Sequence, residues 1–258
     1  MLVRLKSTCR GSHGGLLLAA SLSLALATPA LAGDLPPVEE VFARHTQAVG
    51  GDALGRVKNV AAEYTFSMPA MGLETTGKTY MEAPDKSYTL ISLAAMGGAD
   101  WEDGVNGDVA WQNNPQMGFR VLDGIEKTMA LQKTRLDAFA NWRDIWETAE
   151  TVGEETIGEA VCYKVALTSP SGEDVAAYFD KETGLLLQQE IPLPQMGATV
   201  VVKLSDHREV DGVTVPHFIE QEGPMAALIE YTSLRINVDD IPEGTFEVPQ
   251  GIKDMAAE

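Results

Sequence analysis

The sequence predicts an α+β, mostly β fold: a curved antiparallel sheet of about ten strands, an unclosed barrel whose hollow face is covered by helices. Three observations predict it. Segments in which apolar and polar residues alternate recur at a spacing of about ten residues. Turn signals separate these segments, which favours an antiparallel meander. Two amphipathic helical segments carry apolar stripes that need the hollow face of such a sheet for burial.

The first 32 residues are expected to be a signal peptide that is cleaved after Ala32. Three basic residues precede an apolar run at residues 16–27, and Ala30-Leu31-Ala32 is the small-x-small pattern of a cleavage site. The run is short for a membrane span. We therefore expect an exported, periplasmic protein that is soluble after cleavage, is not an integral membrane protein and is monomeric. Because no linker interrupts residues 33–258, we expect them to form one domain.

The charge is strongly negative. The chain has 38 acidic and 19 basic residues, a net charge of -19, and removing the three basic residues of the signal peptide makes it -22. A protein this acidic is not expected to bind nucleic acid or an anionic lipid surface. A cationic partner remains open.

The mature chain opens with a predicted amphipathic helix. Prolines and glutamates begin it, Val41, Phe42 and His45 recur at helical spacing, and Gly50-Gly51 ends it. A short helical turn at residues 52–56 follows. The next segment is a strand whose apolar face consists of Ala62, Tyr64, Phe66 and Met68.

Further strands are predicted at residues 73–82 and 87–93, and Asn106-Gly107 is a type I′ hairpin signal. One long helix then interrupts the strands. Asp123 is expected to cap it, with Glu126 completing a capping box. Its apolar stripe consists of Ile125, Met129, Leu136, Phe139, Trp142 and Trp146.

From residue 150 to about residue 236 the pattern is strand-like again, with hairpin signals at residues 181–184 and 211–212. Residues 238–249 form a polar closing segment. Cys162 stands alone once Cys9 leaves with the signal peptide, which excludes an intramolecular disulfide. We expect it to be a half-buried structural thiol.

The motifs of catalysis are missing from the sequence. His45, His207 and His217 make no zinc-binding pattern, and neither a nucleophile elbow nor a phosphate-binding glycine loop occurs. We therefore expect no catalytic residue, no metal and no cofactor, and a protein that is not an enzyme. The paired carboxylates of a glycoside hydrolase remain open, because their geometry is invisible in a sequence.

Nine methionines remain in the mature chain, several of them beside proline, glycine or alanine, such as Met71, Met96, Met196 and Met225. Methionine adapts its shape and is common on surfaces that bind varied apolar partners. A cavity for acyl chains is one interpretation, and gap-filling in an ordinary core is the other. The strand and helix periods predict that such a cavity is lined by Tyr64, Phe66, Met68, Tyr80, Met81, Trp111, Phe119, Met129, Leu136 and Phe139.

Four segments carry a family resemblance: Ala48-Val49-Gly50-Gly51, residues 103–115, residues 178–186 and residues 206–216. In this order, after a signal peptide, the chain resembles the outer-membrane lipoprotein-sorting proteins, the LolA-like periplasmic lipoprotein carriers and their lipid-binding superfamily. The resemblance implies a curved sheet whose hollow face, under helices, holds acyl chains. It also implies envelope transport proteins as donor and acceptor partners.

Three function classes follow from these observations. The first is a periplasmic carrier or chaperone that binds the acyl chains of lipoproteins or other lipids for transfer toward the outer membrane. The alternative is a non-transporting interaction or sensor module of the envelope with the same fold. A hydrolase comes last, since no motif supports it.

Overall fold

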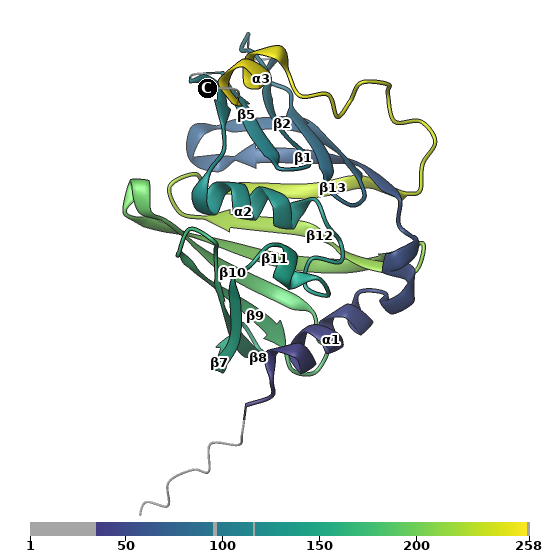
Figure 1. Ribbon diagram of the computed structural model, residues 1–258, viewed down its shortest axis with the longest axis vertical. Helices are drawn as coiled ribbons and strands as arrows, with labels where there is room; N and C mark the ends of the chain where they lie inside the picture. The colour runs from purple at the N-terminus through teal and green to yellow at the C-terminus, as the bar shows by residue number, and fades with distance from the viewer. Residues whose placement is uncertain (1–34, 95–96, 116, 257–258) are drawn as a thin grey trace, which may run out of the picture. The chain divides into compact units, whose positions relative to one another are not determined.

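The computed structural model describes residues 35–94, 97–115 and 117–256. The predicted signal peptide and Met96 lie outside these residues. The described chain forms one sheet of thirteen strands in which all neighbours are antiparallel, and the sheet does not close (Figure 1). The predicted fold class is confirmed. The predicted count of about ten strands is too low, because β3 to β6 are only four to six residues long and each shows few alternations.

The strands follow one another as two meanders. Their bounds are β1 (Asn59–Met68), β2 (Leu73–Glu82), β3 (Lys86–Ile91), β4 (Trp101–Asn106), β5 (Val109–Asn114), β6 (Gly118–Val121), β7 (Thr148–Ile157), β8 (Ala160–Thr168), β9 (Asp174–Asp180), β10 (Leu186–Leu193), β11 (Ala198–Val210), β12 (Val213–Glu222) and β13 (Ala227–Ile236). The spatial order runs from β6 down to β1, then from β13 down to β7. The first and last strands therefore pair in the middle of the sheet, and β6 and β7 are its edges.

The helical segments agree in part with the sequence. α1 (Val38–Ala48) and η1 (Gly51–Arg56) occur as predicted. The single helix predicted from Asp123 to Trp146 is wrong, because α2 (Gly124–Lys133) ends after ten residues and only η4 (Trp142–Asp144) is helical beyond it.

Local side-chain hydrogen bonds accompany this early end. The Thr134 hydroxyl donates to the Leu131 carbonyl at 2.7 Å, and the Asn141 side chain donates to Asp137 at 2.7 Å. Such bonds compete with helical ones. The predicted capping box is also wrong: Asp123 makes no capping bond with its side chain.

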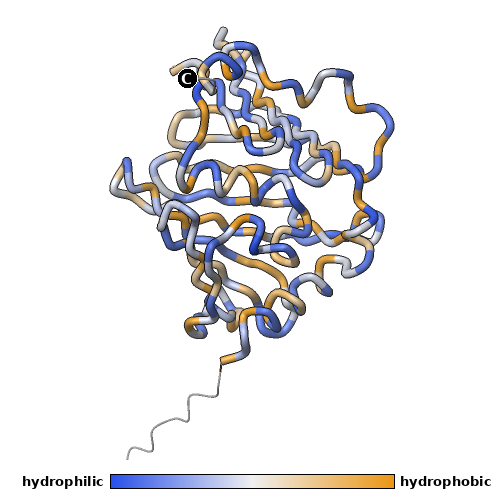
Figure 2. The backbone as a smooth tube through the Cα atoms, in the orientation of Figure 1, coloured by the Kyte–Doolittle hydropathy of each residue, from blue (hydrophilic) through white to orange (hydrophobic). Residues whose placement is uncertain are grey.

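We call residues 122–147 the cover segment. This segment leaves the edge strand β6, crosses the sheet and enters the other edge strand β7. It lies with α1 on one face of the sheet, which we call the inner face (Figure 1). Hydrophobic and hydrophilic residues alternate along parts of the strands (Figure 2), and successive side chains of a strand point to opposite faces of the sheet.

A third helix, α3 (Gln250–Ala256), was not predicted, since it follows a polar segment. α3 packs against β6, where Ile252 is fully buried, and a Cβ on Gly251 would lie 3.5 Å from the Phe119 ring. The β6 end of the sheet is therefore covered on its outer face as well.

Candidate functional site

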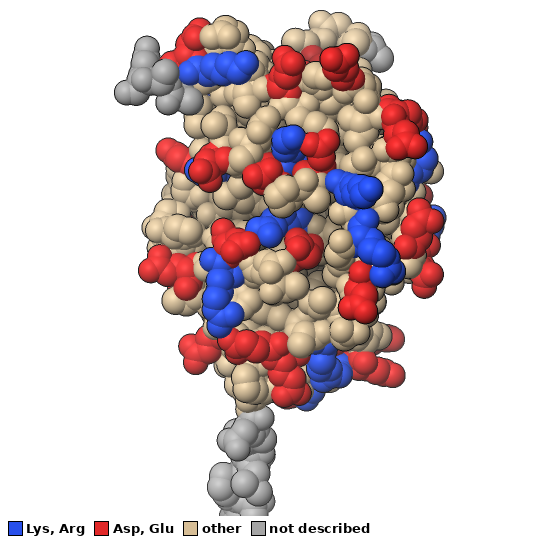
Figure 3. All heavy atoms as spheres, turned by 45° about the vertical axis from the view of Figure 1, so that its right-hand side comes forward, with Lys and Arg blue, Asp and Glu red and all other residues tan. Residues whose placement is uncertain are grey.

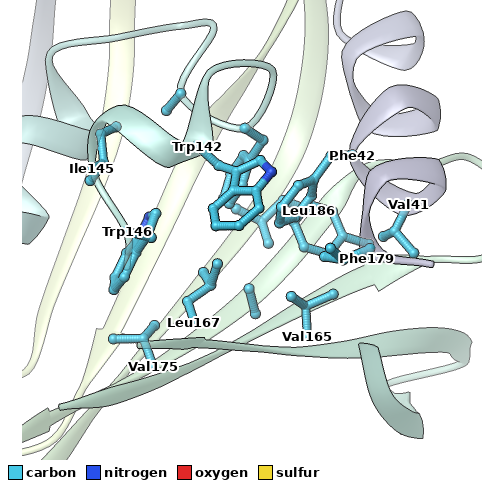
Figure 4. Packing of buried hydrophobic residues seen from close by; sticks show 14 of the residues in the cluster. Val41, Phe42, Trp142, Ile145, Trp146, Val165, Leu167, Val175, Phe179 and Leu186 are labelled. Carbon is cyan, nitrogen blue, oxygen red and sulfur yellow. The ribbon is translucent and has the colours of Figure 1, made fainter. Parts of the chain in front are cut away.

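An aromatic layer fills the space between the inner face and the elements that cover it. Phe42 of α1, Phe139 of the cover segment and Phe179 of β9 form a triangle with ring centroids 5.0 to 5.6 Å apart. Trp142 joins Phe42 at 6.2 Å. Figure 4 shows Trp142, lying near Phe42, among the residues of this layer. Aromatic pairs at these distances are attractive in addition to the area they bury.

The floor of this layer is made by two neighbouring strands. Val165 and Leu167 of β8 lie beside Val175, Ala177 and Phe179 of β9, and each is 1% exposed or less (Figure 4). These residues recur with period two, so all five point to the inner face. The floor is an apolar surface that the cover segment and α1 keep from water.

Polar contacts hold the cover segment on the sheet at two places. At the start of α2, Glu126 receives two hydrogen bonds of 2.7 Å from the guanidinium of Arg120 on β6. In the same helix, the amides of Gln132 and of Gln189 on β10 exchange hydrogen bonds of 3.1 and 3.4 Å in a buried site. The bidentate ion pair is partly exposed, whereas the amide pair is closed off from solvent.

Among the ionisable groups of the inner side, His45 and Asp103 have pKa values that burial shifts. Burial lowers the pKa of His45 to about 4, so its neutral ring donates from Nδ1 to the Gly184 carbonyl at 3.0 Å. Burial raises the pKa of Asp103 on β4, and the nearby charge of Lys133 opposes this shift. Neither arrangement activates a nucleophile.

Seven of the ten residues expected to line a cavity lie on the inner side, in three separate clusters. Tyr64, Phe66 and Met68 of β1 belong to one cluster. Met81 and Leu136 both pack against a second cluster, which contains Val60. Met129 and Phe139 belong to the aromatic layer.

The other three expected residues, Tyr80, Trp111 and Phe119, lie on the outer face. Tyr80 precedes Met81 in β2 and so points to the opposite face. Tyr80 pairs with Tyr88, Tyr88 with Gly104 and Gly104 with Trp111, so these residues share that outer face. Phe119 lies 6.3 Å from Trp111 between ring centroids. Phe119 lies against α3 near Gly251, and all three side chains point away from the cover segment.

Several residues of the layer were missed from the sequence, among them Phe42, Phe179, Val165 and Leu167. The signal was present as the period-two run Val175, Ala177 and Phe179. Cys162, expected to be half-buried, is fully buried, and burial raises its pKa to about 11.

Two hollows open on the surface, with volumes of about 380 and 600 Å³. The first lies at β1 to β3, beside Lys78 and Leu90, and the second lies near Asp206 and His207. None of the residues that line them comes from α1 or the cover segment. Of the ten residues expected to line a cavity, Tyr64 borders the first hollow, and none borders the second.

No family model matches the sequence, and no curated protein matches it either. Solved structures do match. A DUF1329 family protein from Desulfovibrio piger has a TM-score of 0.57 at 17% identity, over 83% of this chain and 98% of its own. A LolA superfamily protein from Nitrosomonas europaea has a TM-score of 0.57 at 12% identity, over 83% and 99%. The chain has the LolA-type fold.

A third structure supports the same conclusion. A domain from Vibrio parahaemolyticus, named for outer membrane lipoprotein sorting, has a TM-score of 0.56 at 10% identity, over 85% of this chain and 98% of its own. At these identities the likeness establishes the LolA-type fold and leaves the activity to be argued from the residues.

In residues 35–94, 97–115 and 117–256, no helix has the length and hydropathy needed to cross a membrane. Within the same ranges, no group of three or more His, Cys, Asp or Glu side chains is placed to hold a metal ion.

Proposed function

We propose that this chain is a periplasmic carrier or chaperone that binds the acyl chains of lipoproteins or other lipids between its inner sheet face and its cover segment. The observation that carries the proposal is the aromatic layer around Phe139 and Phe179. It is the largest apolar cluster of the described residues, and it lies under a cover segment attached by the Arg120–Glu126 and Gln132–Gln189 contacts. Moving that segment would expose a floor suited to acyl chains.

The energetics favour reversible exchange. Burying one methylene stabilises a complex by about 0.8 kcal/mol, so a 16-carbon chain with about 14 methylenes gains about 11 kcal/mol before costs. The cover segment must first leave the floor, which exposes Phe139 and Trp142 and separates the buried glutamines. These costs offset much of the gain, as a carrier that must release its cargo requires. No covalent step and no catalytic group are needed.

Native mass spectrometry tests the proposal directly. The protein is purified from a periplasmic extract without detergent, and a second sample is incubated with a triacylated lipopeptide. We expect a bound acyl species in at least one of the two samples. An apo mass in both would contradict the carrier function.

A locked variant tests the location. Gln132→Cys and Gln189→Cys are introduced together so that oxidation of the exported protein joins them in a disulfide, and the same variant, reduced before the assay, is the control. Cys162 is buried and does not compete. We expect the control to take up the lipopeptide and the joined variant to lose this uptake. Equal uptake by both would place the lipid elsewhere.

One observation favours a second candidate. The aromatic layer is closed by its own side chains, as in a domain core, so the same fold would also serve a non-transporting interaction or sensor module of the envelope. A persistent apo mass together with a stable protein partner would favour this function.

A further inference from the structure

Four exposed methionines lie in turns at one end of the strands. Met71, Met117, Met196 and Met225 are 67%, 68%, 55% and 41% exposed. They lie between β1 and β2, β5 and β6, β10 and β11, and β12 and β13. Because each of these pairs is antiparallel within the two meanders, the four turns share one rim of the sheet. We call these four residues the methionine rim.

The turns at the opposite rim are different in kind. Residues 83–85, 107–108, 158–159, 181–185 and 211–212 contain no methionine, and most of these turns carry charged side chains. The methionines are therefore not scattered over the turns of the described chain. The four methionines lie at one end of the strands.

The same type of turn holds two of the four methionines. η2 (Pro69–Met71) and η5 (Pro194–Met196) are 3-10 turns, each followed by a left-handed glycine, Gly72 with φ 64° and Gly197 with φ 57°. In both turns the glycine N–H donates to the proline carbonyl at 3.1 Å. Met117 precedes a glycine with φ 77° in a third Pro-x-Met-Gly sequence. Glycine adopts this conformation without strain, which fixes the methionine at the tip of the turn.

The rim is apolar and has acidic neighbours. The turn residues 69–72, 194–197 and 223–226 contain no ionisable and no aromatic side chain. Glu74 and Glu222 are exposed at the adjoining strand ends, and Lys203 is paired with Glu222. Segments that enter a lipid surface carry Lys or Arg with Trp, Phe or Leu, and these turns have none of them. An apolar partner with basic flanks fits this chemistry better.

The partner chemistry also agrees with the charge of the chain as a whole, -19. On the face shown in Figure 3, acidic side chains are spread widely and basic ones are interspersed among them. Methionine suits such a surface, because it adapts to varied apolar side chains.

The spacing of the turns matches an α-helix. The turns of Met71, Met225 and Met196 follow one another along the sheet at intervals of two strands. With about 4.8 Å between strands, the interval is about 10 Å. Residues seven apart on an α-helix are about 10.5 Å apart along its axis. Three successive turns can therefore meet three successive apolar residues of one helix.

We infer that the methionine rim docks an amphipathic helix of a partner protein, which has apolar residues at seven-residue intervals and Lys or Arg beside them. This surface lies outside the aromatic layer, so the inference does not rest on acyl binding. A helix laid along apolar anchors is a common mode of peptide recognition.

Methionine-methyl NMR with a synthetic helix tests the inference. The exported protein, labelled with 13C at its methionine methyls, is titrated with an 18-residue Leu/Lys peptide whose leucines form one helical stripe. We expect the signals of Met71, Met196 and Met225 to shift together and that of the buried Met129 to stay. Replacing these three rim residues by glutamine should weaken binding at least tenfold.

The controls separate apolar docking from charge alone. Val152→Gln with Val161→Gln changes two exposed residues on β7 and β8, and should alter the affinity less than twofold. Thermal unfolding of each variant checks its fold. Equal binding of a scrambled Leu/Lys peptide, or full binding by the glutamine variant, would overturn the inference. Rim shifts with phosphatidylcholine vesicles and none with the peptide would also overturn it, in favour of a lipid contact.

Discussion

The buried amide pair between the cover segment and β10 predicts strong non-additivity between two substitutions. Gln132 is 9% exposed and Gln189 5%, and each donates to the other. In Gln189→Leu the Gln132 amide would stay buried without its partner, which costs about 1–3 kcal/mol. Gln132→Leu has the same cost for the same reason. The double variant removes both polar groups and keeps the volume, so its stability should be close to that of the unmodified protein.

Urea unfolding followed by tryptophan fluorescence measures this cycle, since Trp142 and Trp146 report on the cover segment. We expect a coupling of about 2 kcal/mol between the two sites. Gln250→Leu on the exposed side of α3 is the matched control and should change stability by less than about 0.5 kcal/mol. If each single variant loses less than about 0.5 kcal/mol of stability and the two losses simply add in the double variant, the pairing of these amides under a closed cover segment is refuted.

Three further predictions concern the core. Gly104→Ala places a Cβ 2.7 Å from the Trp111 ring and should cost about 1–3 kcal/mol in urea unfolding, whereas Gly153→Ala, with open space around it, should cost less than about 0.5 kcal/mol. His45 has a pKa of about 4 when folded and an ordinary pKa of 6.5 when unfolded, so the unfolded chain takes up the proton first and stability falls as pH drops from 6.5 to 4. That loss, about 3 kcal/mol in total, should be missing from the urea midpoints of His45→Gln. Cys162, with its pKa raised to about 11, should react with a thiol reagent at pH 8 at least about 100-fold more slowly in the folded protein than in urea.

The fold class was predictable because local patterns decide it. β2 has the bounds that period two predicts, and the Asn106-Gly107 turn joins β4 to β5. The pairing of β1 with β13 was not predictable, since it joins residues such as Val60 and Ile236 that lie far apart in the sequence. No local pattern records such a contact.

The site was predictable only in part, and the reason lies in burial on both faces. Period two shows which residues share a face, but it does not show which face the helices cover. Tyr80 and Met81 are neighbours and both apolar enough to be buried, although they point to opposite sides. Because α3 covers the outer face near β6, Trp111 is 3% exposed there. An apolar residue on a strand therefore did not identify the inner face.

The path of the cover segment has a mechanical consequence. The cover segment begins where the edge strand β6 ends and finishes where the edge strand β7 begins. It therefore connects the two edge strands of the sheet in addition to covering the inner face. Lifting the cover segment off the sheet and separating β6 from β7 are coupled movements, because the same residues take part in both. While α2 and η4 stay folded, the length of the cover segment limits how far β6 and β7 can separate. If acyl chains bind under the cover segment as proposed, the length of this connection limits the size of the bound group, in addition to the residues that would contact it.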